Sequence, residues 1–235
     1  MTRIEKIEEL EDFDLGMNDF VDTTTKLPVV IAVDVSDSMN WHGGIDNAYL
    51  AISSFIDAIR SDATASASVE IAIISFNHEV KSIISFSPVK DIPKLDKLKA
   101  SGTTNIAKAV DDALDYIEER YNYYQANGIR KKSGWFILLT DCDIDGNSID
   151  SVVQRTTTLI NNKKLTMFSI GTGNEVNTEQ LKRFNPTKPV LFSPDPEELV
   201  PLFEFLSQTA IGYSQVGEGE SFQSEPLENR RIEFV

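Results

Sequence analysis

The chain has few of the residues that build many common functional sites. One cysteine and two histidines occur in 235 residues, which excludes an internal disulfide framework and a cysteine-type zinc site, and argues against a histidine-rich metal site. No apolar stretch approaches the length of about 20 residues that a membrane-spanning helix needs. The first ten residues do not resemble a secretory signal. We therefore expect a cytoplasmic protein with no membrane partner.

Positive charge is also scarce. The sequence has 22 Lys and Arg against 37 Asp and Glu, a net charge of −15. Nucleic-acid binding needs a basic footprint, so no nucleic-acid partner is expected. Nine of the fifteen excess negative charges lie near the two ends, six in residues 1–25 and three in 213–235. The expected organisation is an acidic N-terminal leader over 1–26, a folded domain over 27–212 and an acidic C-terminal tail over 213–235. The tails either keep the protein soluble or dock on a basic partner or a metal.

Apolar runs of strand length alternate with stretches of helical periodicity. Strands are expected at residues 27–34, 69–76, 80–86, 135–141, 165–171 and 190–192. Helices are expected at residues 45–59, 106–121, 149–160, 177–184 and 199–210, and a polar loop at 122–133. Because continuous apolar strands are buried on both faces, this order predicts an α/β fold. It has a mostly parallel central sheet, one antiparallel edge strand after the Asn77-His78 turn, and helices on both faces.

Two of these strands end in an acid. Asp34 closes the first apolar run, and Asp141 closes the run that begins at Trp135. Ligands of open α/β sheets bind at the carboxyl ends of the strands. Both carboxylates are therefore expected at one edge of the sheet.

Hydroxyl side chains accompany the two acids. Asp34-Val-Ser-Asp-Ser can point Asp34, Ser36 and Ser38 to one side of a turn, and Gly102-Thr-Thr-Asn opens a helix and brings Thr104. Each segment alone is equally typical of Ser and Thr caps on helices and turns. Together they offer hard oxygen donors, which suit Mg2+, with Mn2+ or Ca2+ as alternatives. The predicted metal site comprises Asp34, Ser36, Ser38, Thr104 and Asp141.

The same three segments, in this order, resemble the von Willebrand factor A (vWA) domain. The resemblance covers about residues 27–212. Within the family, the chain looks most like bacterial vWA proteins of the tellurium-resistance type, which also open with a Leu-Pro-Val run and close with a similar helix. The resemblance implies a Rossmann-like fold with a metal-ion-dependent adhesion site (MIDAS), and no catalysis.

In the family, Ser36, Ser38 and Thr104 would contact the metal, and Asp34 and Asp141 would act directly or through water. Neutral hydroxyls leave the charge of the metal only partly compensated, so the metal attracts an external carboxylate. A Glu or Asp of a protein partner would complete the coordination. In the tellurium-resistance type, partners include kinase and phosphatase proteins of stress-response or signalling clusters.

Two residues depart from the family pattern. Cys142 stands where glycine usually follows the acid, and Asp37 stands where glycine often separates the two serines. Neither departure removes a ligand. Thr104 is preferred to Thr103 because Thr followed by Asn-Ile fits the family pattern better.

Two other interpretations of the acids remain open. The segment from Asp141 through Asp143 and Asp145 to Gly146 matches the first half of a calcium loop, but its twelfth position is Val152 instead of Glu. Asp143 and Asp145 thus form a candidate secondary acidic site. Alternatively, strand-end aspartates serve metal-dependent hydrolases and phosphatases, here through Asp34 and Asp141, although the Asp-x-Asp-x-Thr pattern is absent at both positions.

Overall fold

The fold is seen in a computed structural model, which describes residues 24–141, 149–173, 176–217 and 233–234. In this part of the chain, seven strands form one sheet in the order β3-β2-β1-β4-β5-β6-β7. The strands are β1 (Leu27–Asp34), β2 (Val69–Phe76), β3 (Val80–Pro88), β4 (Gly134–Thr140), β5 (Leu165–Thr172), β6 (Leu191–Ser193) and β7 (Glu233–Phe234).

The strands of the sheet run mostly in one direction. β1, β2, β4, β5 and β6 run parallel to one another, and β3 pairs antiparallel with β2 at one edge. The predicted α/β fold, with its antiparallel edge strand, is therefore confirmed. The two-residue β7 adds a short antiparallel pair to β6 at the opposite edge, which the sequence did not suggest.

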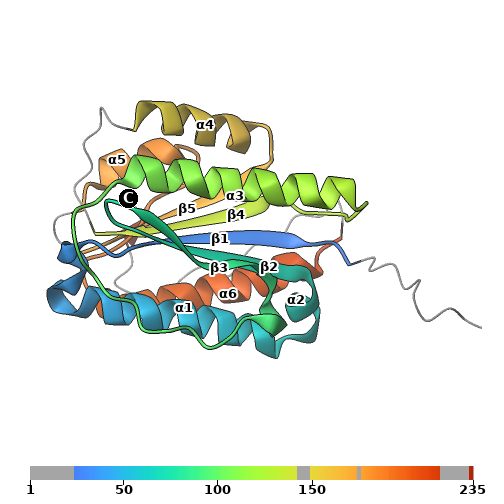
Figure 1. Cartoon of the computed structure of the whole chain (residues 1–235), viewed down its shortest axis with the longest axis horizontal. Helices are drawn as coiled ribbons and strands as arrows, with labels where there is room; N and C mark the ends of the chain where they lie inside the picture. The colour runs from blue at the N-terminus through green and yellow to red at the C-terminus, as the bar shows by residue number, and fades with distance from the viewer. Residues whose placement is uncertain (1–23, 142–148, 174–175, 218–232, 235) are drawn as a thin grey trace, which may run out of the picture.

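Six α-helices of the described residues cover the two faces of the sheet (Figure 1). On one face lie α1 (Gly44–Ser61), α2 (Ala63–Ser68) and α6 (Leu199–Gln215). On the other lie α3 (Ile106–Ala126), α4 (Asp150–Asn161) and α5 (Thr178–Phe184). None of the described helices combines the length and hydrophobicity that crossing a membrane requires.

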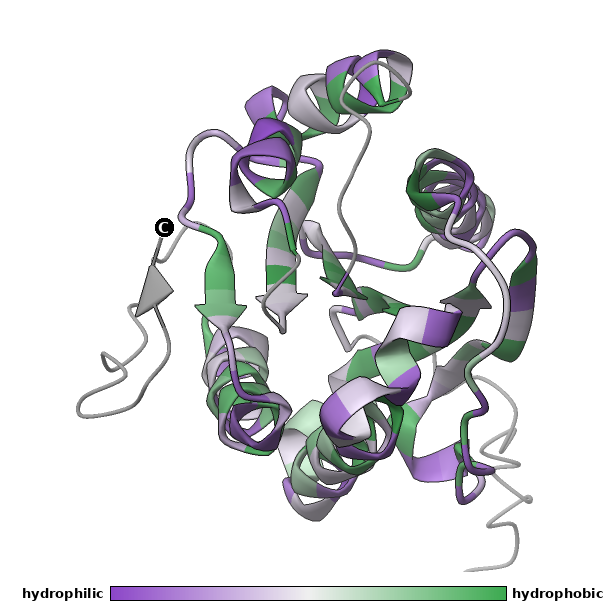
Figure 2. Cartoon of the chain, turned by 90° about the vertical axis from the view of Figure 1, so that its left-hand side faces the viewer, coloured by the Kyte–Doolittle hydropathy of each residue, from purple (hydrophilic) through white to green (hydrophobic). Residues whose placement is uncertain are grey.

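The alternation of side chains along the strands creates two cores. On β1, Val29, Ile31 and Val33 pack toward α1 and α6. Val30 and Ala32 pack toward α3. Both sets are completely buried, as expected for a strand inside a parallel sheet. Figure 2 shows the result: the strands are mainly green and lie between two groups of helices whose outer faces are purple.

The buried side of α3 carries one ion pair. Arg120 donates from Nε and Nη2 to Oε2 of Glu70 on β2, at 2.8 and 2.6 Å. The hydroxyl of Tyr124 donates to the same oxygen. Glu70 is only 5% exposed and Tyr124 is fully buried. Burial, together with the adjacent carboxylate, raises the pKa of Tyr124 above its ordinary value, which keeps the phenol protonated as a donor.

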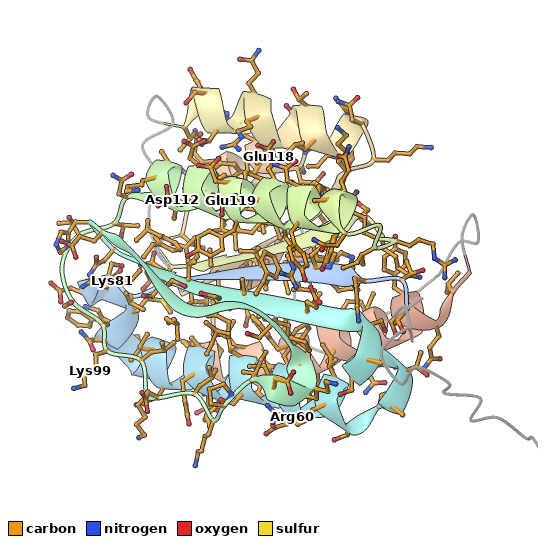
Figure 3. The ribbon with its side chains drawn as sticks, turned by 45° about the vertical axis from the view of Figure 1, so that its right-hand side comes forward. Arg60, Lys81, Lys99, Asp112, Glu118 and Glu119 are labelled. Carbon is orange, nitrogen blue, oxygen red and sulfur yellow. The ribbon has the colours of Figure 1, made fainter. Side chains whose placement is uncertain are left out.

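The exposed side of α3 is acidic (Figure 3). Arg155 of α4 reaches Asp111, Asp115 and Glu118 at 2.7, 2.6 and 2.8 Å. These three carboxylates remain about half exposed. These ion pairs connect α4 to α3. Because solvent screens exposed charges, they add little to the free energy of unfolding.

One local prediction is wrong, and one short helix was not predicted. The loop expected to begin at Asn122 begins later, since α3 continues to Ala126 and buries Tyr124. The short helix α2 was not anticipated; Asp62 caps it by accepting a hydrogen bond from the amide of Ala65 at 2.7 Å. The expected leader and tail lie largely outside the described residues.

Candidate metal centre

Asp34 lies at the carboxyl end of β1, in the middle of the sheet. Val33 pairs with Leu139 of β4, so Thr140 comes next to Asp34. The Thr140 hydroxyl donates to Oδ2 of Asp34 at 2.6 Å, and the amide of Ser36 donates to Oδ1 at 2.8 Å. Both carboxylate oxygens are thereby held in fixed directions at the edge of the sheet.

A chain of hydroxyls leads from this loop to Asp141. Ser38 Oγ donates to Oδ1 of Asp141 at 2.8 Å, and Ser36 Oγ lies 2.9 Å from Ser38 Oγ. Since the single hydroxyl hydrogen of Ser38 goes to Asp141, Ser36 is the donor to Ser38. The loop after β1 and the end of β4 are therefore joined by side chains as well as by the sheet.

The carboxylate of Asp34 is buried without an opposite charge. Its exposed fraction is 0%, and among the described residues no Lys or Arg forms an ion pair with it. Burial raises the pKa of Asp34 from 3.8 to about 6, against the lowering effect of the hydrogen bonds from Thr140 and Ser36. A cation beside this carboxylate would remove the cost of its burial.

The loop before α3 is tied to the loop after β1 by backbone hydrogen bonds. The amide of Asp37 donates to the carbonyl of Gly102 at 2.9 Å, and the amide of Ser101 donates to the carbonyl of Val35 at 2.8 Å. Gly102 has φ +77°, a left-handed conformation that glycine adopts without strain. These bonds hold the segment carrying Thr104, which is half-buried, beside the Ser36 loop.

The predicted site residues are thus brought together to different degrees. Asp34, Ser36, Ser38 and Asp141 belong to one group connected by hydrogen bonds and the short loop after β1. Thr104 is on a neighbouring loop, and among the described residues its side chain makes no hydrogen bond to the group. Asp143 and Asp145, and with them the calcium-loop alternative, lie outside the described residues.

The donor set fits a hard divalent cation. In the described part of the chain, no three His, Cys, Asp or Glu side chains gather into a metal site of their own. The group offers two carboxylates and two hydroxyls, with the Thr104 hydroxyl on the adjacent loop. Oxygen donors of this kind suit Mg2+, Mn2+ and Ca2+ better than softer metals.

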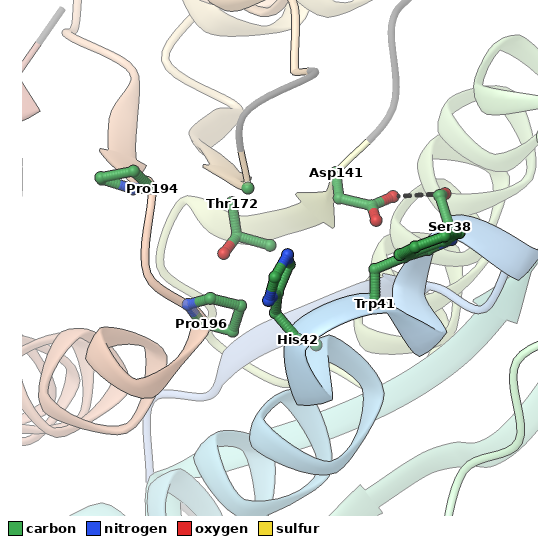
Figure 4. Close-up of a pocket in the computed structure, with 9 residues that line it drawn as sticks. Ser38, Trp41, His42, Asp141, Thr172, Pro194 and Pro196 are labelled. Carbon is green, nitrogen blue, oxygen red and sulfur yellow. Dashed lines mark hydrogen bonds between the residues drawn. The ribbon is translucent and has the colours of Figure 1, made fainter.

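A pocket of about 210 Å³ adjoins the group (Figure 4). Ser38 and Asp141 form its side toward the candidate metal centre. Its other lining residues are Trp41, His42, Gly44, Thr172, Gly173, Pro194 and Pro196. None of these residues was part of the site predicted from the sequence. The unusual φ of +51° at His42 is visible only in the structure, whereas a tryptophan three residues after Ser38 was an available signal.

Solved structures with the same fold include several vWA proteins. A von Willebrand factor type A protein from Catenulispora acidiphila matches with a TM-score of 0.64 and 18% identity, over 80% of this chain and 43% of that one. Proximal thread matrix protein 1 of the mussel byssus, with a zinc-occupied MIDAS motif, matches with a TM-score of 0.55 and 18% identity, over 79% and 48%. This chain therefore spans less than half the length of either protein.

A third structure, the manganese-loaded TRAP protein of Plasmodium vivax, matches with a TM-score of 0.55 and 15% identity, over 77% of this chain and 72% of that one. Likenesses at these identities show the fold alone. No curated protein has significant sequence similarity to the chain. The family model for the von Willebrand factor type A domain, however, matches residues 29–204. The sheet, the helices on its two faces and this match together show that the chain belongs to the von Willebrand factor type A domain family.

Proposed function

We propose that the chain is a divalent-metal-dependent protein-binding module, with a MIDAS formed by Asp34, Ser36, Ser38, Thr104 and Asp141. The observation that supports it best is the buried carboxylate of Asp34, which pairs with no Lys or Arg of the described residues and lies next to the hydrogen-bonded series from Ser36 through Ser38 to Asp141. A bound cation would supply a positive charge at the carboxyl edge of the sheet, where it attracts a Glu or Asp of a partner. The relatives with metal-occupied sites support the same proposal.

We expect Mg2+ as the resident metal, with Mn2+ or Ca2+ able to replace it. The hydroxyls and carboxylates are hard donors, and none of the group's side chains is a thiolate or imidazole. Zinc in the mussel protein and manganese in the Plasmodium protein are the metals of those structures. Magnesium is favoured here because a site with few carboxylates leaves several positions for water, which Mg2+ retains readily.

Binding rather than catalysis is part of this proposal. A hydrolase that uses Asp34 as a nucleophile would need one carboxylate oxygen free to attack. Both oxygens of Asp34 accept hydrogen bonds, and the side chain has no exposed surface. The competing hydrolase hypothesis predicts turnover of a generic phosphate ester such as p-nitrophenyl phosphate with Mg2+.

We also propose a more specific cellular role. The resemblance to the tellurium-resistance type suggests a cytoplasmic adaptor in bacterial stress response or signalling. Its partners would be acidic surfaces of kinase or phosphatase proteins. This part rests on the Leu27-Pro28-Val29 opening and the character of α6, and not on the site.

The metal requirement can be tested by thermal unfolding and a carboxylate probe. Mn2+ or Mg2+ at about 100 times its Kd should stabilise the EDTA-treated protein by about 2.7 kcal/mol. For a domain of this size the melting temperature should rise by roughly 5–10 °C. In the same buffers, N-acetyl-glutamate amide should bind with the metal and not with EDTA. Ser38→Ala should reduce both effects, because it removes one donor and the bond to Asp141.

Ser87→Ala is the matched control. Its hydroxyl also makes one short-range bond, to the carbonyl of Ser85 at 2.9 Å, but Ser87 pairs with Ile71 near the opposite end of the sheet. This variant should respond to metal as the wild type does. A metal-induced rise that is absent in the wild type, or is unchanged in Ser38→Ala, would contradict the proposed site.

A further inference from the structure

One polar side chain beside the candidate metal centre lacks a hydrogen-bond partner. Thr172, the last residue of β5, is only 1% exposed, and its Oγ1 has no partner among the described residues. Buried hydroxyls are nearly always hydrogen-bonded, so an orphan needs an explanation. Thr172 lines the pocket next to Asp141, and in Figure 4 it lies between the two prolines and the His42 ring. The unused hydroxyl is therefore available to a ligand that enters this pocket.

Three further lining residues, Trp41, Pro194 and Pro196, present flat apolar surfaces. Pro194 and Pro196 form one side, and Trp41 stands at the opposite rim with 73% of its surface exposed. Among the described residues it is the most exposed of the large hydrophobic side chains. Exposed tryptophans commonly mark places where a partner docks. The pocket thus combines apolar surfaces from Trp41 and two prolines with polar lining groups, among which the Thr172 hydroxyl has no hydrogen-bond partner among the described residues.

The segment that presents Trp41 is held in an unusual conformation. The 3-10 helix η1 (Asp37–Gly43) contains non-helical angles at Trp41 and a left-handed φ of +51° at His42. Left-handed angles are uncommon for residues other than glycine and cost free energy. The His42 ring points into the pocket, as Figure 4 shows. This geometry favours a binding role for the segment over a purely connecting one.

The volume of the pocket and the charges beside it limit which chemical group can bind there. The volume of about 210 Å³ is below the roughly 300–1,000 Å³ of pockets for drug-sized molecules, so one side chain fits better than a cofactor. With a metal ion in the adjacent site, a Lys or Arg side chain would be repelled, and a Glu or Asp would bind the metal itself instead of the pocket. An aliphatic side chain would leave the Thr172 hydroxyl unpaired. A phenol satisfies all of these conditions, since its ring packs on Trp41 and the prolines while its hydroxyl pairs with Thr172.

We propose that this pocket binds a tyrosine of the partner, next to the Glu or Asp that binds the metal. The inference rests on the proposed function for the acidic residue, whereas the pocket itself is present without metal. The module would then recognise an acidic residue adjacent to a tyrosine, rather than any exposed carboxylate.

The pocket can be tested with small probes in EDTA, independently of the metal. The protein has two tryptophans, so its NMR spectrum contains two indole N–H signals, assigned with Trp41→Phe. N-acetyl-tyrosine amide should shift the Trp41 signal and leave that of Trp135, which is 3% exposed, in place. It should bind about fivefold more tightly than N-acetyl-phenylalanine amide, the gain from one hydrogen bond. A shift confined to Trp135, or no preference for tyrosine, would overturn the proposal.

A Thr172 variant tests whether the hydroxyl acts in binding, because its loss should affect ligand preference without harming folding. Thr172→Val keeps the shape and removes the hydroxyl, so it should raise the melting temperature and abolish the preference for tyrosine over phenylalanine. Ser169→Ala removes the other unpartnered buried hydroxyl of β5, outside the pocket lining, and should keep the preference. Retention of the preference in Thr172→Val would overturn the role of the hydroxyl.

The dipeptide N-acetyl-Glu-Tyr amide links the two sites. With Mg2+ it should bind at least tenfold more tightly than in EDTA, and more tightly than N-acetyl-Glu-Ala amide. If tyrosine probes bind but Mg2+ adds nothing, the metal function fails and the pocket stands. If N-acetyl-Glu-Ala amide binds with Mg2+ as tightly as the tyrosine dipeptide, the metal function stands and the pocket proposal is overturned.

Discussion

Arg120→Ala should lower the free energy of unfolding by about 3–5 kcal/mol, because it leaves a carboxylate without its charge partner inside the protein. Glu70 is 5% exposed, and its Oε2 receives both donors of Arg120 as well as the Tyr124 hydroxyl. The guanidinium also lies over the ring of Tyr123, 4.5 Å from its centroid. Urea denaturation at pH 7 would measure the loss.

Arg155→Ala is the matched control for this prediction. Arg155 has three ion pairs instead of one, but its partners Asp111, Asp115 and Glu118 have side chains 52%, 58% and 47% exposed. Water solvates these carboxylates when the arginine is removed, so the expected loss is about 1 kcal/mol or less. Equal losses of unfolding free energy in the two variants would show that burial of the carboxylate does not determine the cost of removing its arginine.

The same buried group can be replaced as a whole. A triple variant with Glu70→Leu, Arg120→Met and Tyr124→Phe removes every polar member together and leaves no unpaired charge. It should recover at least half of the stability lost in Arg120→Ala, as apolar replacement of buried ion pairs commonly does. A triple variant less stable than Arg120→Ala would contradict this account.

The fold was predictable from the sequence because the strands of a parallel sheet are buried on both faces. Each central strand appears as a continuous apolar run, as in Leu27–Asp34, and each covering helix as an apolar stripe. The short elements were harder to predict. Helix α2 has only six residues, and its signal was the capping Asp62. Strand β7 has two residues and depends on pairing with β6, a long-range contact that local pattern does not encode.

The proximity of four of the candidate site residues was predictable from the sequence, but the side chains around them were not. Asp34, Ser36, Ser38 and Asp141 follow strands that end at one edge, and topology alone brings them together. The role proposed for Thr172 depends on its hydroxyl having no hydrogen-bond partner among the described residues. A threonine at the end of a strand carries no sequence signal for such an absence. Its identification required the packing of β5 against the loops at Pro194 and His42.

Asp34→Asn should abolish the metal response while leaving the metal-free protein at least as stable as the wild type. Loss of an outer-shell group costs about 10–100-fold in metal affinity, and loss of a direct ligand with its charge costs more. The amide can keep both hydrogen bonds: Oδ1 accepts from the amide of Ser36, and Nδ2 donates to the Thr140 hydroxyl. Titration with Mn2+, followed by electron paramagnetic resonance, measures the affinity directly.

The pKa of Asp34 determines whether Asp34→Asn raises or lowers the stability of the metal-free protein. Burial raises the pKa of Asp34 from 3.8 to about 6, which corresponds to a cost of about 3 kcal/mol for the ionised form in the folded protein. Because the folded pKa lies above the unfolded one, the cost is absent below pH 3.8, grows as the pH approaches 6 and is complete at pH 7. Metal-free Asp34→Asn, which does not ionise, should therefore melt above the metal-free wild type at pH 7.

Asp37→Asn makes the same change of charge three residues later, on an exposed side chain. It should bind Mn2+ nearly as the wild type does, since solvent and salt screen an exposed carboxylate. Comparable losses of Mn2+ affinity in the two variants would indicate a general attraction to the acidic loop. Wild-type affinity in Asp34→Asn would remove Asp34 from the site. A large loss in Asp34→Asn alone, with a higher metal-free melting temperature, would mean that this buried carboxylate is kept, at a cost in stability, for the metal.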